Sequence, residues 1–311
     1  MEIMEKYQRR FRDQGVKLHF SCSMDGLIID KINRPFNDDH EKTVEYYSNI
    51  LAFCKANDVG FHPMIAAENI EYQKENYDAW LEIIKSFCDN PVNLPSYFAR
   101  IMQLVVRNTG WTEDKIKSYL DWVNYVMDKD LETFFYSDKN DFITKLYSEK
   151  EPWSKNYLPY KFLNGYFAYA CTMGSMLSIR VGDLSIVPCH RTSYDKFILG
   201  KFIVENDEIV DVEANNIQMA SAVFLTNAIS KPHCNQCPIS QYCMKGCIGS
   251  QYETLNEPFC PIPDVCDLLK ANFLFLYLKH EKMGAFNNAE FMARNPDIHL
   301  IYKNLVVKEN C

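Results

Sequence analysis

One short segment of the chain holds more cysteine than a core helix or strand would. Its four cysteines are separated by two, five and three residues and stand at Cys234, Cys237, Cys243 and Cys247. Pro238 and Gly246 interrupt the segment, and its apolar residues follow no sustained period, which excludes a core helix or strand. The spacing predicts a metal-binding loop, and Cys260 and Cys266 follow it closely in the sequence.

The composition is that of an ordinary globular protein and disfavours two kinds of partner. Of its 311 residues, 47% are hydrophobic and 24% charged, enough to form one or two cores. The net charge of -8 disfavours nucleic acid as the main partner and suits a neutral or basic peptide better. The longest aliphatic and aromatic run, 273–278, is too short to span a membrane, so we expect a cytoplasmic protein. In that compartment the twelve cysteines would be reduced, and clustered ones indicate metal ligands.

The alternation of helical and strand-like patterns predicts an α/β fold for the first part of the chain. Residues 1–90 read as helix, strand, helix, strand and helix, which implies parallel strands joined by right-handed crossovers. Residues 95–150 are mostly helical in pattern, with a helix start at Thr112. A second domain is expected to begin near residue 155, with short strands up to residue 212. A helix over 268–282 is expected to follow, and then a short helix and a strand.

Two metals fit a set of soft sulfur ligands. Four thiolates in a tetrahedral arrangement suit either zinc or an iron-sulfur cluster. A structural zinc ribbon needs two cysteine pairs, usually with two-residue spacing, whereas only Cys234 and Cys237 are spaced in this way. An iron-sulfur interpretation uses more of the thiols, because Cys171 and Cys189 precede the loop and Cys260 and Cys266 follow it.

The full cysteine pattern resembles the SPASM domain of radical S-adenosylmethionine (SAM) peptide maturases. The likeness lies in Cys-x2-Cys-x5-Cys-x3-Cys with a later cysteine, preceded by Cys171, Gly182 and Pro188-Cys189. That family carries two auxiliary four-iron clusters. By this likeness the first cluster is held by Cys171, Cys189 and Cys247, and the second by Cys234, Cys237, Cys243 and Cys260. Cys266 is an alternative to Cys260. The fourth position of the first cluster is left for an open iron, a substrate ligand or His190.

The first part of the chain resembles the SAM-binding region of the same enzymes. The segment Ser23-Met24-Asp25-Gly26, followed by Asp30 and Arg34, is similar to the family's fourth-strand segment. The resemblance implies that Ser23, Asp25 and Arg34 belong to the SAM site and that Glu68 and Asn69 follow the next strand at its ligand-binding end. The competing interpretation is a plain Asp-Gly turn with Arg34 in a surface ion pair.

Together the two resemblances imply a domain organisation. Residues 1–154 would be the C-terminal part of a partial (β/α) radical SAM barrel, from strand four onward, with a helical extension. Residues 155–311 would be an α+β, cysteine-rich SPASM domain ending in a helix. The chain contains no Cys-x3-Cys-x2-Cys loop, the motif that binds the SAM-cleaving cluster. We therefore expect a chain that begins about halfway through the barrel, from a truncated frame or a longer protein, and that does not cleave SAM alone.

The function that the resemblance implies is modification of a ribosomally made peptide. In such an oxidoreductase a radical made from SAM abstracts hydrogen from the precursor peptide, and flavodoxin or ferredoxin supplies electrons. Sulfatase maturases carry Asp after the second cysteine, whereas this chain has His190, which favours a Cys-linked crosslink such as a thioether. His190 is a candidate catalytic residue or a hydrogen-bonded surface residue. The other class of function is a non-catalytic, zinc- or iron-sulfur-stabilised module that binds a peptide or protein.

Overall fold

The chain folds into two compact units of mixed helix and strand. A computed structural model describes fifteen stretches of it, namely residues 2–15, 22–23, 45–46, 48–53, 61–62, 64–86, 103–104, 110–133, 177–206, 208–228, 234, 236–240, 242–243, 247–282 and 284–309. The first unit comprises residues 1–104 and 113–161, and the second comprises 105–112 and 162–311. The boundary predicted at 154/155 lies outside the described residues. Among the described helices, none combines the length and apolar character needed to cross a membrane.

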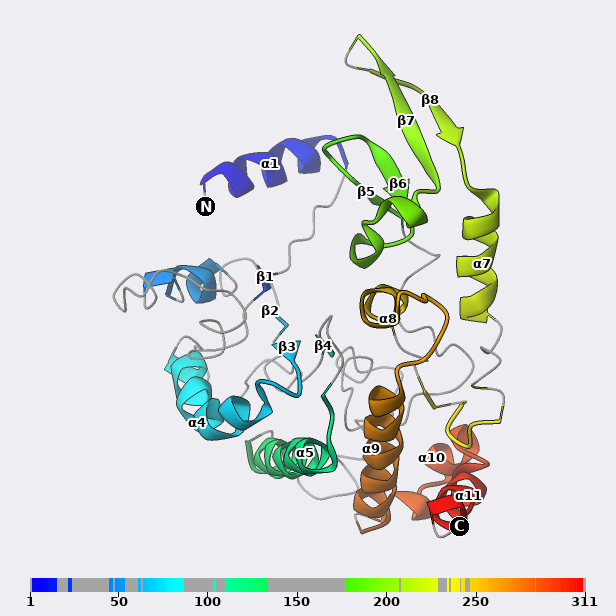
Figure 1. Ribbon diagram of the computed structural model, residues 1–311. Coiled ribbons are helices and arrows are strands. Elements are labelled where there is room, and N and C mark those ends of the chain that lie inside the picture. Colours follow the sequence, from blue (N-terminus) through cyan, green and yellow to red (C-terminus); the bar gives the residue numbers. More distant parts are fainter. Residues whose placement is uncertain are drawn as a thin grey trace. The chain divides into compact units, whose positions relative to one another are not determined.

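The first unit contains short parallel strand pairs and long helices (Figure 1). Its elements are α1 (Glu2–Asp13), β1 (Cys22–Ser23), β2 (Phe61–His62), β3 (Met64–Ile65), α4 (Ile70–Ser86), β4 (Gln103–Leu104) and α5 (Glu113–Thr133). β1 pairs with β2 and β3 pairs with β4, both in parallel. Parallel pairing is what an alternation of strands and helices produces. Closure into a partial barrel stays a prediction.

Helices α4 and α5 pack through aromatic side chains. The Tyr77 ring meets the Trp122 ring edge-on at a centroid distance of 6.1 Å, and both side chains are buried. The Tyr125 hydroxyl donates to the Asp78 carboxylate at 2.6 Å, which ties the two helices at the surface. Aromatic pairs of this geometry stabilise packing beyond the area they bury.

The second unit combines one antiparallel sheet with a set of helices. Its strands are β5 (Ser178–Ile179), β6 (Ser185–Val187), β7 (Gly200–Glu205) and β8 (Glu208–Ala214), in that spatial order. Its helices are α7 (Ile217–Ala228), α8 (Ile248–Leu255), α9 (Pro263–Lys282), α10 (Ala289–Arg294) and α11 (Ile298–Glu309). Three short 3-10 helices join them, η4 (His190–Thr192), η5 (Asp195–Phe197) and η7 (Ala285–Asn287).

Two buried regions stabilise this unit. One forms where Phe197, Val223 and Ile248 meet, with Cys189 packed against them. The other lies between α9 and α11. There the Tyr277 ring stacks on that of Tyr302 at 3.9 Å. The cysteine-bearing segments therefore lie within or beside hydrophobic packing, which fixes their positions.

The expected strand beyond residue 282 is wrong. That part of the chain forms α10 and α11, and Ile298, Ile301 and Leu305 are buried at spacings of three and four residues, which is helical periodicity. The helix expected over 268–282 is confirmed but begins earlier, at Pro263, where proline suits a first helical position. The helices expected at the N-terminus and after Thr112 are confirmed as α1 and α5.

Candidate metal centre

The predicted metal loop consists of successive tight turns. The Cys237 N–H donates to the Cys234 carbonyl at 3.1 Å, and the Ser240 N–H donates to the Cys237 carbonyl at 3.0 Å. The Tyr242 N–H then donates to the Ile239 carbonyl at 2.8 Å. Because Ile239 and Tyr242 are buried, they anchor the turns. The prediction that this segment is a loop and not a core element is confirmed for its described residues.

The loop lies against one face of α9. The Tyr242 ring is tilted on the Phe273 ring, with centroids 5.4 Å apart. Cys266, Lys270 and Phe273 stand four and three residues apart on α9, so they share a face. Contact at Phe273 therefore turns the Cys266 thiol toward the side of the helix on which the loop lies.

The electrostatics of Cys266 place it near two loop cysteines. The pKa of the Cys266 thiol is raised to about 11, mainly by burial; the charges of Cys234 and Cys237 also raise it, and the Lys270 ammonium lowers it. Thiolates this close repel one another, so they ionise together only when a cation offsets the charge. A metal ion is the kind of cation that could offset this charge and take thiolates as ligands.

A second group of cysteine segments forms around η4 and α8. Cys189 is the N-cap of η4, and its Sγ accepts from the Arg191 N–H at 3.5 Å. Cys247 is the N-cap of α8. The two elements touch, because the Arg191 guanidinium donates to the Ser250 hydroxyl at 3.4 Å. Cys189 and Cys247, assigned by resemblance to one cluster, therefore stand on neighbouring elements.

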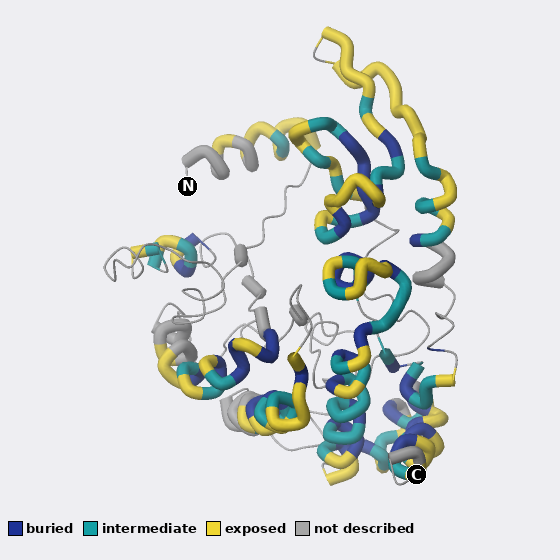
Figure 2. The backbone as a smooth tube through the Cα atoms, viewed as in Figure 1, coloured by how far each residue is buried: buried dark blue, intermediate teal, exposed yellow. Residues whose placement is uncertain are grey.

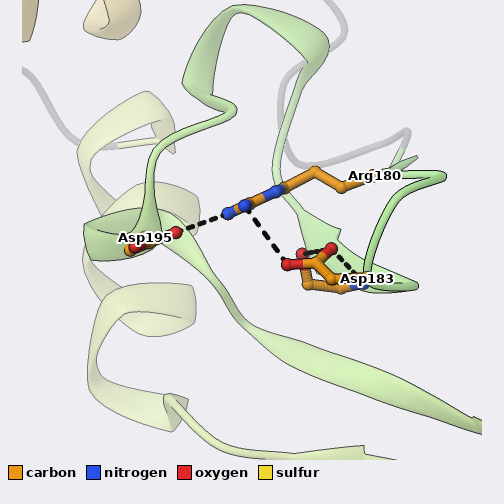
Figure 3. Close-up of polar contacts among 4 residues, drawn as sticks. Arg180, Asp183 and Asp195 are labelled. Carbon is orange, nitrogen blue, oxygen red and sulfur yellow. Dashed lines mark hydrogen bonds and ion pairs between the residues drawn. The ribbon is translucent and has the colours of Figure 1, made fainter.

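An ion-pair network braces the segment that leads to Cys189. Figure 3 shows Arg180 between two carboxylates, with Asp195 on η5 at 2.6 Å and Asp183 in the turn before β6 at 3.2 Å. The Ser185 hydroxyl also donates to Asp183 at 2.7 Å. Hydrogen bonds from the Ser185 side chain and backbone, with the Arg180 charge, lower the pKa of Asp183. The ionised Asp183 carboxylate thus orients Arg180, whose guanidinium joins the β5–β6 turn to Asp195 of η5.

The remaining predicted metal ligands are less closely grouped. Cys243 and Cys260 are half-buried thiols, and the Cys260 Sγ lies 3.9 Å from the Pro261 carbonyl. Cys171 lies outside the described residues. His190 is exposed, with its Nδ1 3.7 Å from the Cys189 Sγ. Within the part of the chain that the structure describes, no three His, Cys, Asp or Glu side chains converge closely enough to hold a metal ion.

The donor chemistry nevertheless fits a sulfur-ligated group. None of the seven described cysteines forms a disulfide. They are Cys189, Cys234, Cys237, Cys243, Cys247, Cys260 and Cys266. Six of them are only half-buried, so they are reachable. Soft ligands of this kind favour zinc or an iron-sulfur cluster over magnesium or calcium.

The predicted SAM-site residues fall into three groups. Ser23 lies on β1, where it pairs with His62 of β2. Asp25 and Arg34 lie outside the described residues. Glu68 and Asn69 lie in the turn that follows β3, but only Glu68 is exposed.

Asn69 has a structural role that its sequence context did not reveal. Its side chain is 1% exposed, and its Oδ1 accepts from the Ala66 N–H at 2.9 Å. Its carbonyl accepts from the Gln73 N–H, which starts α4. Asn is a preferred residue before a first helical turn, so its position before α4 could have indicated a structural role from the sequence. Lys270 was also missed, although it stands one helical turn after Cys266.

Comparison with known proteins gives no match from which the site could be assigned. No protein-family model matches the chain, and no curated protein or solved structure does so either.

Replacing Asn69 should separate its structural role from ligand binding. Asn69→Ala leaves the buried Ala66 N–H without its acceptor, so we expect the free energy of unfolding to fall by about 1–2 kcal/mol in urea denaturation. Glu68→Ala, one residue earlier and exposed, should change it by less than about 0.5 kcal/mol. Equal stability of both variants would refute the structural role.

The contact between η4 and α8 predicts that alanine is tolerated at Gly182 but not at Gly249. An alanine inside an exposed helix usually stabilises by about 1 kcal/mol relative to glycine. At Gly249 of α8, however, a Cβ would lie 2.5 Å from the Arg191 carbonyl oxygen. Gly249→Ala should therefore lower the free energy of unfolding by about 1–3 kcal/mol.

The matched control is Gly182→Ala, because a Cβ there meets nothing within 4 Å. We expect its thermal unfolding to follow that of the parent protein. A stabilised Gly249→Ala variant would mean that η4 and α8 do not touch as described.

Proposed function

We propose that this chain is a radical SAM/SPASM maturase that binds auxiliary four-iron clusters and takes part in modifying a ribosomally made peptide, with a Cys-linked crosslink such as a thioether as product. The supporting observation is that Cys266 lies within electrostatic range of Cys234 and Cys237. These three thiols come from a loop and a helix and are the sulfur donors that a metal cluster would use, and the spacing of all the cysteines resembles that of the SPASM domain.

The geometry favours one change to the ligand set implied by resemblance. For one cluster we propose Cys234, Cys237 and Cys243, with Cys266 as the fourth ligand. Cys266 is preferred because the charges of Cys234 and Cys237 contribute to the raised pKa of its thiol. For the other cluster we propose Cys189 and Cys247, which stand on touching elements, together with Cys171. His190 is its candidate fourth ligand, and the SAM site is proposed near Ser23, Asp25, Arg34 and Glu68, with the buried Asn69 supporting the turn that carries Glu68.

The protein's own residues would set the environment of the bound group. When bound, iron-sulfur clusters supply one-electron chemistry and a soft metal for a substrate thiolate. Ile239, Tyr242 and Phe273 exclude water from one side of the thiols. The Lys270 ammonium, ion-paired with Asp267 at 3.1 Å, lies near Cys266 and Cys237, where it would partly offset the negative charge of ligand sulfurs. Positive charge beside a cluster raises its reduction potential, because the reduced form is more negative.

Metal content distinguishes the proposed maturase from a zinc-stabilised binding module, because the same thiols could bind either metal. After anaerobic reconstitution with iron and sulfide, we expect about eight irons per chain and the brown absorbance of two four-iron clusters. A colourless protein with stoichiometric zinc would contradict the maturase proposal and support the binding module.

A pair of cysteine variants tests the ligand assignment itself. Cys266→Ser removes a proposed ligand, so the reconstituted protein should lose about four irons. Cys260→Ser changes a half-buried thiol six residues earlier and should keep about eight irons. The reverse result, with iron lost only from the Cys260 variant, would show that Cys260 and not Cys266 binds the cluster.

A further inference from the structure

Strands β7 and β8 form a hairpin that extends beyond the rest of their sheet. β7 has six residues and β8 seven, whereas β5 has two and β6 three. β6 reaches along β7 only as far as Lys201. Every residue of β8 is exposed, and Figure 2 shows the hairpin exposed along most of its length. A two-stranded hairpin has little stability of its own in water.

The two faces of this hairpin differ sharply in chemistry. On one face Phe202 stands opposite Val212, and Val204 stands opposite Ile209. We call these four residues the apolar face. Ile209 is 62% exposed, Val212 48% and Val204 41%. The register shifts between Ile203 and Val204, so the two pairs flank an irregularity in the ladder. Directly opposite residues lie on the same side of an antiparallel pair, and Phe202 and Val204 are two residues apart on β7, so the four side chains share one face.

The opposite face is acidic. Lys201 stands opposite Glu213, Ile203 opposite Asp211, and Glu205 opposite Glu208. Like charges directly opposite each other destabilise a strand pair. The pairing of Glu205 with Glu208 therefore costs stability unless a cation lies between the two carboxylates.

Among the strands that the structure describes, none pairs with the outer side of β8, which is therefore a sheet edge. β8 is the last strand in the order of its sheet. The Phe202 N–H donates to the Leu184 carbonyl, so it points away from β8. Its partner Val212 correspondingly directs its N–H outward, where it donates to the Asp211 carboxylate at 2.7 Å. An additional strand could pair with the backbone of β8 here, provided that the Asp211 carboxylate releases the Val212 N–H.

The charge pattern decides which strand fits. A second copy of β8 would bring two acidic strands side by side, where their carboxylates repel. A basic segment would place its Lys or Arg side chains on the acidic face. Its apolar side chains, one residue apart from the basic ones, would cover the apolar face. Complementary charge of this kind also speeds association.

We propose that the edge of β8 and the apolar face of the hairpin dock an extended, basic peptide segment in which apolar and cationic residues alternate. The inference depends on Phe202, Val204, Ile209 and Val212 and on the acids beside them. It goes beyond the proposed cluster chemistry and does not depend on it. Loss of peptide binding and loss of iron are therefore separate outcomes.

The test uses the full chain and two peptides of about eight residues, long enough to cover β8. One peptide alternates Val and Lys, and the other alternates Val and Glu. Fluorescence anisotropy should show binding of the Val/Lys peptide that weakens as salt is added, with no binding of the Val/Glu peptide. Equal binding of both peptides, or of neither, would overturn the proposal.

Two variants locate the binding surface. Val212→Lys places a charge on the apolar face and should weaken binding of the Val/Lys peptide at least about tenfold. Val181→Lys makes the same change at a valine that is 87% exposed in the β5–β6 turn, and it should bind like the parent chain. If both variants bind equally well, β8 is not the site.

A charge reversal guards against a variant that merely misfolds. Asp211→Lys combined with Glu213→Lys should lose the Val/Lys peptide and gain the Val/Glu peptide, which an unfolded hairpin would not do. Circular dichroism checks that the sheet is retained. If the charge-reversed protein still prefers the Val/Lys peptide, another surface binds it. If the parent chain dimerises in sedimentation and the Val212→Lys variant does not, a second copy occupies this edge instead of a peptide.

Discussion

Crowding of thiols around the first turns of α9 is the constraint on which the site depends. Cys266 lies near Cys234 and Cys237, and burial together with those neighbours holds its pKa at about 11. Without a cation the Cys266 thiol stays protonated, because burial and the neighbouring sulfurs disfavour its thiolate. In the proposed site a bound metal would take the thiolates as ligands, and the energy of metal binding would then contribute to folding of the loop.

The loop could be predicted because it depends on local sequence, whereas its metal chemistry stays a prediction. Cysteine spacing, Pro238 and Gly246 are visible in the sequence, and they exclude a core helix or strand without knowledge of the fold. Which thiols meet could not be predicted in the same way. Cys266 reaches the loop because Tyr242 packs on Phe273, a contact across about thirty residues that spacing alone does not encode.

Whether a segment forms a helix or a strand likewise depends on both local sequence and long-range packing. The periodic helices α1, α4 and α5 were predictable, because each carries a clear apolar stripe. The region that became α11 was expected to contain a strand, since its short apolar runs suit either state. Burial of Ile298, Ile301 and Leu305, at spacings of three and four residues, favours the helix. Asn69 likewise looked like a ligand residue, and only its buried hydrogen bond shows that it supports the start of α4.

The nature of the bound metal is the central claim, and X-ray absorption on the purified, anaerobically reconstituted protein tests it most directly. The account predicts an iron spectrum with sulfur neighbours and, in addition, iron–iron scattering, which only a cluster produces. A zinc spectrum with sulfur neighbours and no metal–metal scattering would contradict it.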